Sequence, residues 1–170
     1  MAKEIERTFL VITSALPELG GHVAIEQGYL SEDPCVRVRT LSRDGVTIAR
    51  LTVKGRGLEI RDEYEWEIPV ADAGEILSRG LWQHALVKNR YQLGRWEIDE
   101  FKGENLAGLW LAEIELERKQ ERFDLPDWLG PEVTHDSRFT NLGLARDGVP
   151  DDYWQWVSTG KWHALDFGSE

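Results

Sequence analysis

Several short segments of the chain alternate charged with apolar residues, and within each segment the charges have one sign. Side chains two residues apart in a β-strand lie on the same face, so Arg37 and Arg39 share a face. The other rows of this kind are Glu4 and Glu6; Glu63, Glu65 and Glu67; Lys88 and Arg90; Glu97 and Asp99; and Glu113, Glu115 and Glu117. The solvated face of an ordinary sheet would explain the alternation, but not the sorting by sign.

Like charges on one face repel each other, by about 2 kcal/mol for a pair roughly 7 Å apart at an effective dielectric near 20. A ligand of opposite charge would remove this cost. Acidic rows without a histidine or cysteine cluster favour a hard divalent cation, Mg²⁺ or Mn²⁺, and basic rows favour phosphate groups. The sequence has no P-loop, nucleophile elbow or dinucleotide fingerprint, so phosphate binding would depend on side chains.

Eight period-two segments are predicted to be strands, and short connections join most of them. They are residues 3–12, 22–30, 35–43, 46–54, 60–68, 85–93, 95–101 and 109–117. Helices are predicted at residues 71–79 and 136–146. Eight strands in one domain favour a closed antiparallel barrel or a sandwich.

The bulk composition narrows the class of protein. A chain of 170 residues suits one domain, and its net charge of -11 argues against a nucleic-acid backbone as partner. Cys35 is the only cysteine, which excludes an intramolecular disulfide and predicts a reducing, cytoplasmic location. No apolar run approaches the roughly 20 residues of a membrane span, and no membrane partner is expected.

The charged rows form an ordered series of motifs. The series begins with Glu4-Ile5-Glu6-Arg7-Thr8 and continues through residues 27–30, 36–39, 52–54, 63–65, 88–91, 97–101, 112–115 and 132–141. In this order the motifs resemble those of the CYTH superfamily, the triphosphate tunnel metalloenzymes, and in particular its small bacterial tripolyphosphatase-like members. The resemblance runs from about Lys3 to Ala145.

The resemblance implies a mainly β fold, an eight-stranded antiparallel closed β-barrel with a few flanking helices. Residues 1–145 would form the tunnel domain, and the aromatic-rich extension 146–170 would pack on it. The implied metal ligands are Glu4, Glu6, Asp99, Glu113 and Glu115, with Glu63, Glu65 and Glu97 as supporting acids. The implied phosphate ligands are Arg37, Arg39, Lys54, Lys88, Arg90 and Arg138. Lys88 and Glu115 are the predicted catalytic residues.

The predicted function is metal-dependent hydrolysis of a triphosphate in the tunnel, with inorganic tripolyphosphate as the favoured substrate. Thr8 departs from the family pattern, which has lysine there, and Ser137 takes a second frequent lysine position. These departures leave open a binding module without turnover. They also leave open an activity like that of class IV adenylate cyclases, or of thiamine or nucleoside triphosphatases. A homodimer through the tryptophan-rich tail is a further open alternative.

Overall fold

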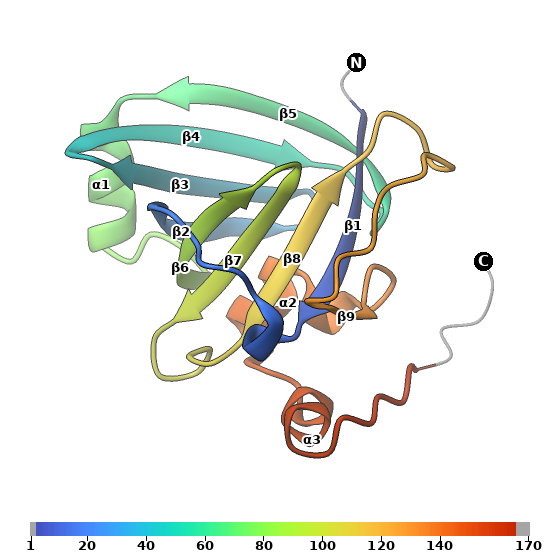
Figure 1. The fold of residues 1–170 in the computed structure, drawn as a ribbon. Helices are drawn as coiled ribbons and strands as arrows, with labels where there is room; N and C mark the ends of the chain where they lie inside the picture. The colour runs from blue at the N-terminus through green and yellow to red at the C-terminus, as the bar shows by residue number, and fades with distance from the viewer. Residues whose placement is uncertain (1–2, 166–170) are drawn as a thin grey trace.

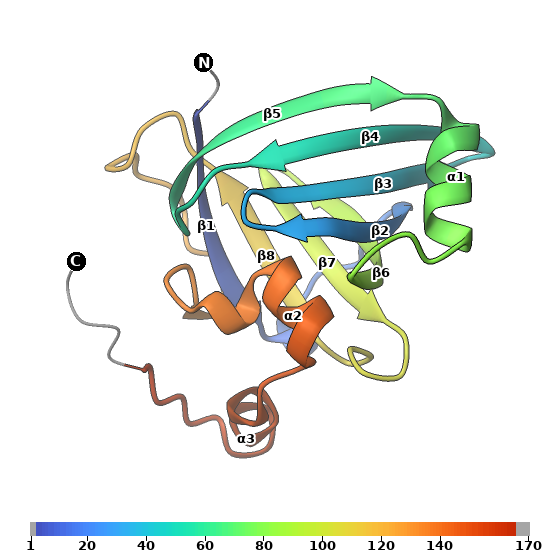
Figure 2. The ribbon, with the colours of Figure 1, turned by 180° about the vertical axis from the view of Figure 1, so that it is seen from behind.

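The strands form an antiparallel sheet that closes on itself, seen from opposite sides in Figures 1 and 2. The computed structural model describes residues 3–165. Its strands are β1 (Lys3–Val11), β2 (His22–Glu32), β3 (Cys35–Arg43), β4 (Val46–Lys54), β5 (Ile60–Ile68), β6 (His84–Leu93), β7 (Trp96–Lys102), β8 (Trp110–Glu115) and β9 (Leu129–Glu132). Its α-helices are α1 (Val70–Ser78), α2 (Asn141–Asp147) and α3 (Asp151–Thr159).

Eight strands make the barrel, in the order β5-β4-β3-β2-β6-β7-β8-β1. The barrel closes where β1 pairs with β5, a seam of three residue pairs that begins with Lys3 opposite Asp62. Further along, β1 pairs with β8, and the short strand β9 adds to β1 near its end. The predicted eight-stranded antiparallel barrel is therefore confirmed.

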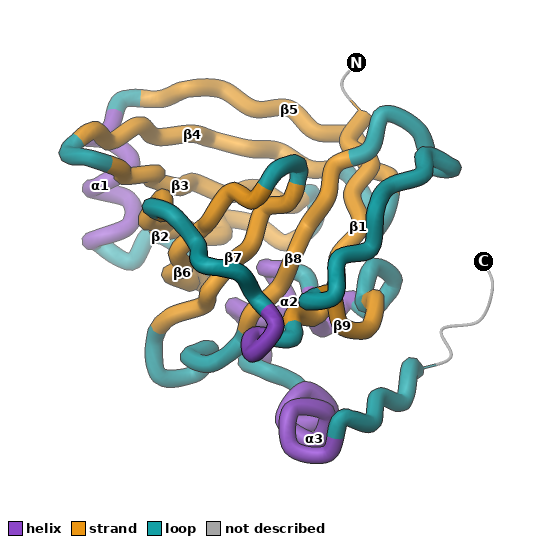
Figure 3. The backbone as a smooth tube through the Cα atoms, viewed as in Figure 1, coloured by secondary structure: helices purple, strands orange, loops and turns teal. Residues whose placement is uncertain are grey.

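The charged side chains face the interior, so the apolar side chains lie on the outer faces of the strands and must be covered by helices and loops. α1 covers β3 and β4, where Ala73 packs with Val38 and Ala49. The loops that lead into β2 and β9, teal in Figure 3, cover β1, β7 and β8. Trp96 of β7 makes an edge contact there with Trp128, at a centroid distance of 5.4 Å. The alternation read from the sequence thus belongs to a barrel with a polar interior.

Apolar side chains fill one end of the barrel, and α2 closes it (Figure 2). Leu10 and Phe101 of the strands pack with Phe139 and Leu144 of the closing segment. Tyr153 of α3 is 1% exposed and belongs to the same cluster. The charged part of the interior therefore lies above a packed apolar floor.

The prediction of one helix over residues 136–146 is wrong for its first half. Residues Ser137–Phe139 form a 3-10 turn, and α2 begins only at Asn141. Thr140 between them is extended, with φ -67° and ψ 150°, and its Oγ1 accepts a hydrogen bond from the Gly143 amide at 3.0 Å. This is the geometry of a helix N-cap, whose backbone is not helical, so the two turns cannot be continuous.

The other predicted elements are found with small shifts. The eight predicted strands are confirmed to within two residues at each end, and the helix at 71–79 to within one. β9 and α3 are additional; β9 contains Gly130 and Pro131 and shows no alternation. None of the helices in residues 3–165 is long and apolar enough to cross a membrane. Of the predicted extension, residues 166–170 lie outside the described part, and its boundary at 145 stays a prediction.

Candidate functional site

A charged cavity of about 470 Å³ occupies the interior of the barrel, a volume within the usual range of small-ligand sites. Eight basic and eight acidic side chains line it. The basic ones are Arg37, Arg39, Arg50, Lys54, Arg61, Lys88, Arg90 and Arg95. The acidic ones are Glu4, Glu6, Glu63, Glu65, Glu97, Glu113, Glu115 and Asp136. Five of the six predicted phosphate ligands therefore meet in one cavity, together with four of the five predicted metal ligands.

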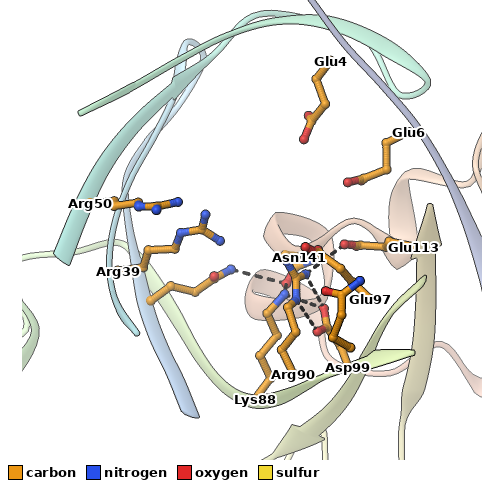
Figure 4. Close-up of polar contacts among 12 residues, drawn as sticks. Glu4, Glu6, Arg39, Arg50, Lys88, Arg90, Glu97, Asp99, Glu113 and Asn141 are labelled. Atoms are coloured by element: carbon orange, nitrogen blue, oxygen red, sulfur yellow. Dashed lines mark hydrogen bonds and ion pairs between the residues drawn. The ribbon is translucent and has the colours of Figure 1, made fainter. Parts of the chain in front are cut away.

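The basic and the acidic side chains lie on different sides of this cavity. Figure 4 shows Arg39 and Arg50 on one side, with Glu4, Glu6 and Glu113 on the other. The consecutive strands β4, β3, β2 and β6 carry six of the cations, and we call this side the basic wall. The consecutive strands β7, β8, β1 and β5 carry seven of the acids, and we call this side the acidic wall. A ligand that enters the cavity thus meets a cationic and an anionic surface at once.

Ion pairs form where the two walls meet. At the β4–β5 boundary, Lys54 Nζ lies 3.1 Å from Glu4 and 2.9 Å from Glu63. Arg39 and Arg50 both pair with Glu65, at 3.1 and 2.8 Å. The repulsion within each like-signed row is thus partly offset by the neighbouring row of opposite sign. Sequence spacing could not show this, because it does not reveal which strands are neighbours.

Lys88 is the most deeply buried cation of the site, at 1% exposure. Its Nζ donates hydrogen bonds to Asp99 Oδ2 at 2.6 Å and to Asn141 Oδ1 at 2.8 Å. Arg90 donates two further bonds to the Asp99 carboxylate, at 2.7 and 2.8 Å (Figure 4). Burial, and then the charge of Arg90, lower the pKa of Lys88 to about 8. A lysine with such a pKa is suited to proton transfer near neutral pH.

The carboxylates of β1 have very different proton affinities. Burial alone would raise the pKa of Glu4, but the charges of Lys54 and Arg61 bring it down to about 2. For Glu6, burial and the charges of Glu113 and Glu4 raise the pKa to about 8. Glu6 therefore holds a proton at neutral pH in the metal-free protein. The charges of Arg61 and Lys54 lower the pKa of Glu6 by less than burial and the two carboxylates raise it.

The acidic wall has the donor chemistry that a hard divalent cation needs. On the neighbouring strands β1 and β8, Glu6 lies opposite Glu115 and Thr8 lies opposite Glu113. Carboxylate oxygens are the preferred ligands of Mg²⁺ and Mn²⁺. Within residues 3–165, however, no three His, Cys, Asp or Glu side chains are grouped closely enough to hold a metal ion together. The carboxylates would therefore shift when they share a cation.

Two of the predicted site residues lie outside the cavity lining. Asp99, a predicted metal ligand, is fully buried and bound to Lys88 and Arg90. Arg138, a predicted phosphate ligand, pairs with Asp136 at 2.8 Å and with Asp152 at 2.9 Å. Both residues act as ion-pair partners in this arrangement, and their ligand roles stay predictions.

Several residues of the site were not singled out from the sequence, among them Arg50, Arg61 and Asn141. Arg61 and Arg50 line the cavity, and each lies two residues before a member of an inward-facing row, Glu63 and Thr52. The period-two spacing was therefore a sufficient signal for both. Asn141 reaches Lys88 because α2 begins at residue 141, and the alternation of the strands gives no signal for that.

Comparison with known proteins supplies relatives of the whole chain, although no protein-family model matches it. A protein of Acetivibrio thermocellus named inorganic triphosphatase is 44% identical over 154 residues, which are 86% of this chain and 96% of that protein. One of Nitrosomonas europaea with the same name is 37% identical over 150 residues, 84% of this chain and 96% of its own. The crystal structure of the inorganic triphosphatase NE1496 matches with a TM-score of 0.60 and 32% identity, over 88% of this chain and 98% of that one.

An eight-stranded antiparallel barrel with charged walls around an internal cavity is the architecture expected of a triphosphate tunnel protein. With relatives this similar over nearly their full length, the chain belongs to the CYTH family of triphosphate tunnel metalloenzymes. The resemblance identified from the ordered motifs is confirmed. Enzymes of this family generally depend on metal ions.

Proposed function

We propose that the protein hydrolyses inorganic triphosphate inside the barrel, with Mg²⁺ or Mn²⁺ as cofactor. The observation that carries the proposal is the division of one cavity into a basic and an acidic wall. The basic wall suits a chain of phosphates, and the acidic wall suits the divalent cation that accompanies such a chain. The names of the two relatives support inorganic triphosphate as the substrate.

The basic wall would bind and orient the substrate. Arg37 and Arg39 are each 8% exposed, and each has a buried Nε that lacks a hydrogen-bond partner among the described residues. Such unsatisfied donors are costly unless a ligand pairs with them. Guanidinium groups can bind phosphate oxygens through two parallel bonds, which fixes the position of a phosphate chain.

Lys88 would transfer a proton during hydrolysis, as predicted from the sequence. Its Nζ is held by Asp99 and Asn141 at the floor of the cavity, and its pKa of about 8 allows both protonation states near neutral pH. A divalent cation bound by the acidic wall would supply charge stabilisation and a water of lowered pKa. Glu115, at the exposed end of β8, would orient that water.

Phosphate release tests the proposal directly. Tripolyphosphate, ATP and thiamine triphosphate are each offered with Mg²⁺ and with Mn²⁺. We expect the highest kcat/KM for tripolyphosphate, a fall of at least about tenfold in Arg39→Gln, and no change in Arg56→Gln. Arg56 is a matched control because its side chain is 87% exposed and pairs with Asp33 outside the cavity. Tripolyphosphate binding by calorimetry without phosphate release would instead favour a binding module.

A further inference from the structure

Arg61 breaks the sorting of charges by sign, because it is a cation on the acidic wall. It lies on β5, two residues before Glu63, and faces the cavity with that row. The register of the closing seam places it directly opposite Glu4 of β1. Its side chain is only 15% exposed. Such a position needs an explanation, since a buried guanidinium must be paired.

The partners of Arg61 are the two carboxylates of β1. Its Nε donates to Glu4 Oε2 at 2.8 Å, and its Nη2 donates to Glu6 Oε1 at 3.4 Å. Lys54 also reaches Glu4, but no other cation in residues 3–165 lies within ion-pair distance of Glu6. Glu4 and Glu6 are predicted metal ligands. A divalent cation that bound both would therefore compete with the guanidinium of Arg61.

A second partner for a displaced Arg61 is a phosphate group. Thr8 stands where the family has a phosphate-binding lysine, so β1 contributes no cation to the cavity. Arg61 lines the same cavity as Arg37 and Arg39 of the opposite wall. Its two parallel donors, which bind two carboxylates here, have the spacing that phosphate oxygens require.

We propose that Arg61 is a specificity-determining residue that alternates between two anions. In the metal-free protein it is the counterion of Glu4 and a hydrogen-bond donor to Glu6, and when a divalent cation occupies these carboxylates it becomes a ligand of the phosphate chain. The inference rests on the proposed function for its substrate. Its consequence is that Arg61 weakens the binding of a free metal ion and strengthens the binding of triphosphate.

The competing explanation is structural. The seam between β1 and β5 has only three residue pairs, and the bond from Arg61 to Glu4 spans it. If Arg61 only held the barrel closed, its loss would weaken the binding of metal and of triphosphate alike. If the loss of Arg61 changes the affinities for metal and for triphosphate in opposite directions, the specificity role is distinguished from this structural role.

The experiment compares Arg61→Gln with wild type and with Arg56→Gln, an exposed arginine near the same hairpin whose loss changes the net charge equally. Calorimetry measures Mn²⁺ binding to the free protein, and steady-state kinetics measure KM and kcat for tripolyphosphate at saturating Mn²⁺. We expect Arg61→Gln to bind Mn²⁺ at least about threefold more tightly, and its KM to rise about tenfold. We expect kcat to change less than KM, and Arg56→Gln to match wild type.

Arg61→Lys covers the case in which the glutamine variant does not fold, because it keeps a cation at the seam. A lysine has no two-donor fork, so we expect about a twofold gain in Mn²⁺ affinity and a several-fold rise in KM. Mn²⁺ binding that weakens in the folded variants, or a KM that stays at the wild-type value, would overturn the proposal. If wild type releases no phosphate at all, the proposed function fails. Calorimetry with Mn²⁺ and with tripolyphosphate then decides the role of Arg61 without turnover.

Discussion

Replacing Glu6 by glutamine should stabilise the metal-free protein, and the gain should grow with pH. The native pKa of Glu6 is about 8, against 4.5 for a free glutamate. Between these values the folded state holds a proton that the unfolded state has lost, so stability falls as pH rises through this window. At pH 7, about 2.5 units above the unfolded pKa, keeping this proton lowers the free energy of unfolding by about 3 kcal/mol. A glutamine at this position avoids the loss. Because 17% of the side chain is exposed, we expect a gain of about 2 kcal/mol at pH 7.

Urea unfolding followed by tryptophan fluorescence, with a chelator present, measures this gain at pH 5, 7 and 8. At pH 5 the gain should shrink to less than about 1 kcal/mol, because this pH lies only about half a unit above the pKa of 4.5 that Glu6 has in the unfolded state. Glu67→Gln is the control, since Glu67 lies exposed on β5 outside the cavity. With saturating Mn²⁺ the order should reverse, and wild type should be the more stable protein. A gain that is the same at pH 5 and pH 8 would refute the account of Glu6.

Three further substitutions test other parts of the site. Glu115→Gln should lower Mn²⁺-dependent phosphate release at least about tenfold, with metal-free thermal stability unchanged or raised; unchanged turnover at saturating Mn²⁺ would contradict the role of Glu115. Asp99→Asn should lower the free energy of unfolding in urea by about 3 kcal/mol, because it removes the carboxylate that Lys88 and Arg90 share. A loss below about 1 kcal/mol would contradict this. Thr8→Lys should tighten tripolyphosphate binding about ten- to a hundredfold by calorimetry; no change for tripolyphosphate or ATP would mean that residue 8 does not contact the phosphates.

The period-two pattern was sufficient to predict which side chains face the cavity. Alternation depends only on local backbone geometry, so Arg37, Arg39 and Lys54 could be assigned to the interior without a structure. The same rule applied to residue 61 would have found Arg61. Alternation alone could not distinguish a closed barrel from a sandwich. The resemblance of the ordered motifs to a known family predicted the barrel.

The contacts between the rows could not be predicted, because they depend on long-range strand order. β6 pairs with β2 rather than with β5, its predecessor in sequence, and this brings Lys88 into the basic wall. Lys54 meets Glu4 only because the barrel closes between β5 and β1. The bond from Lys88 to Asn141 depends on the N-cap at Thr140, which ends one turn and begins the next.

The balance of eight cations and eight carboxylates in the cavity has a consequence for how substrate arrives. The formal charges of the two sets cancel, so the formal net charge of -11 belongs to residues outside the cavity lining. An anion approaching from solution would therefore meet a net repulsive potential before it reaches the arginines of the cavity, and this potential is screened over about 8 Å at physiological salt. Free triphosphate would be slowed on approach, whereas its complex with a divalent cation carries less negative charge. The outer surface would thus favour the approach of the metal-bound form of the substrate, before the cavity contributes any affinity.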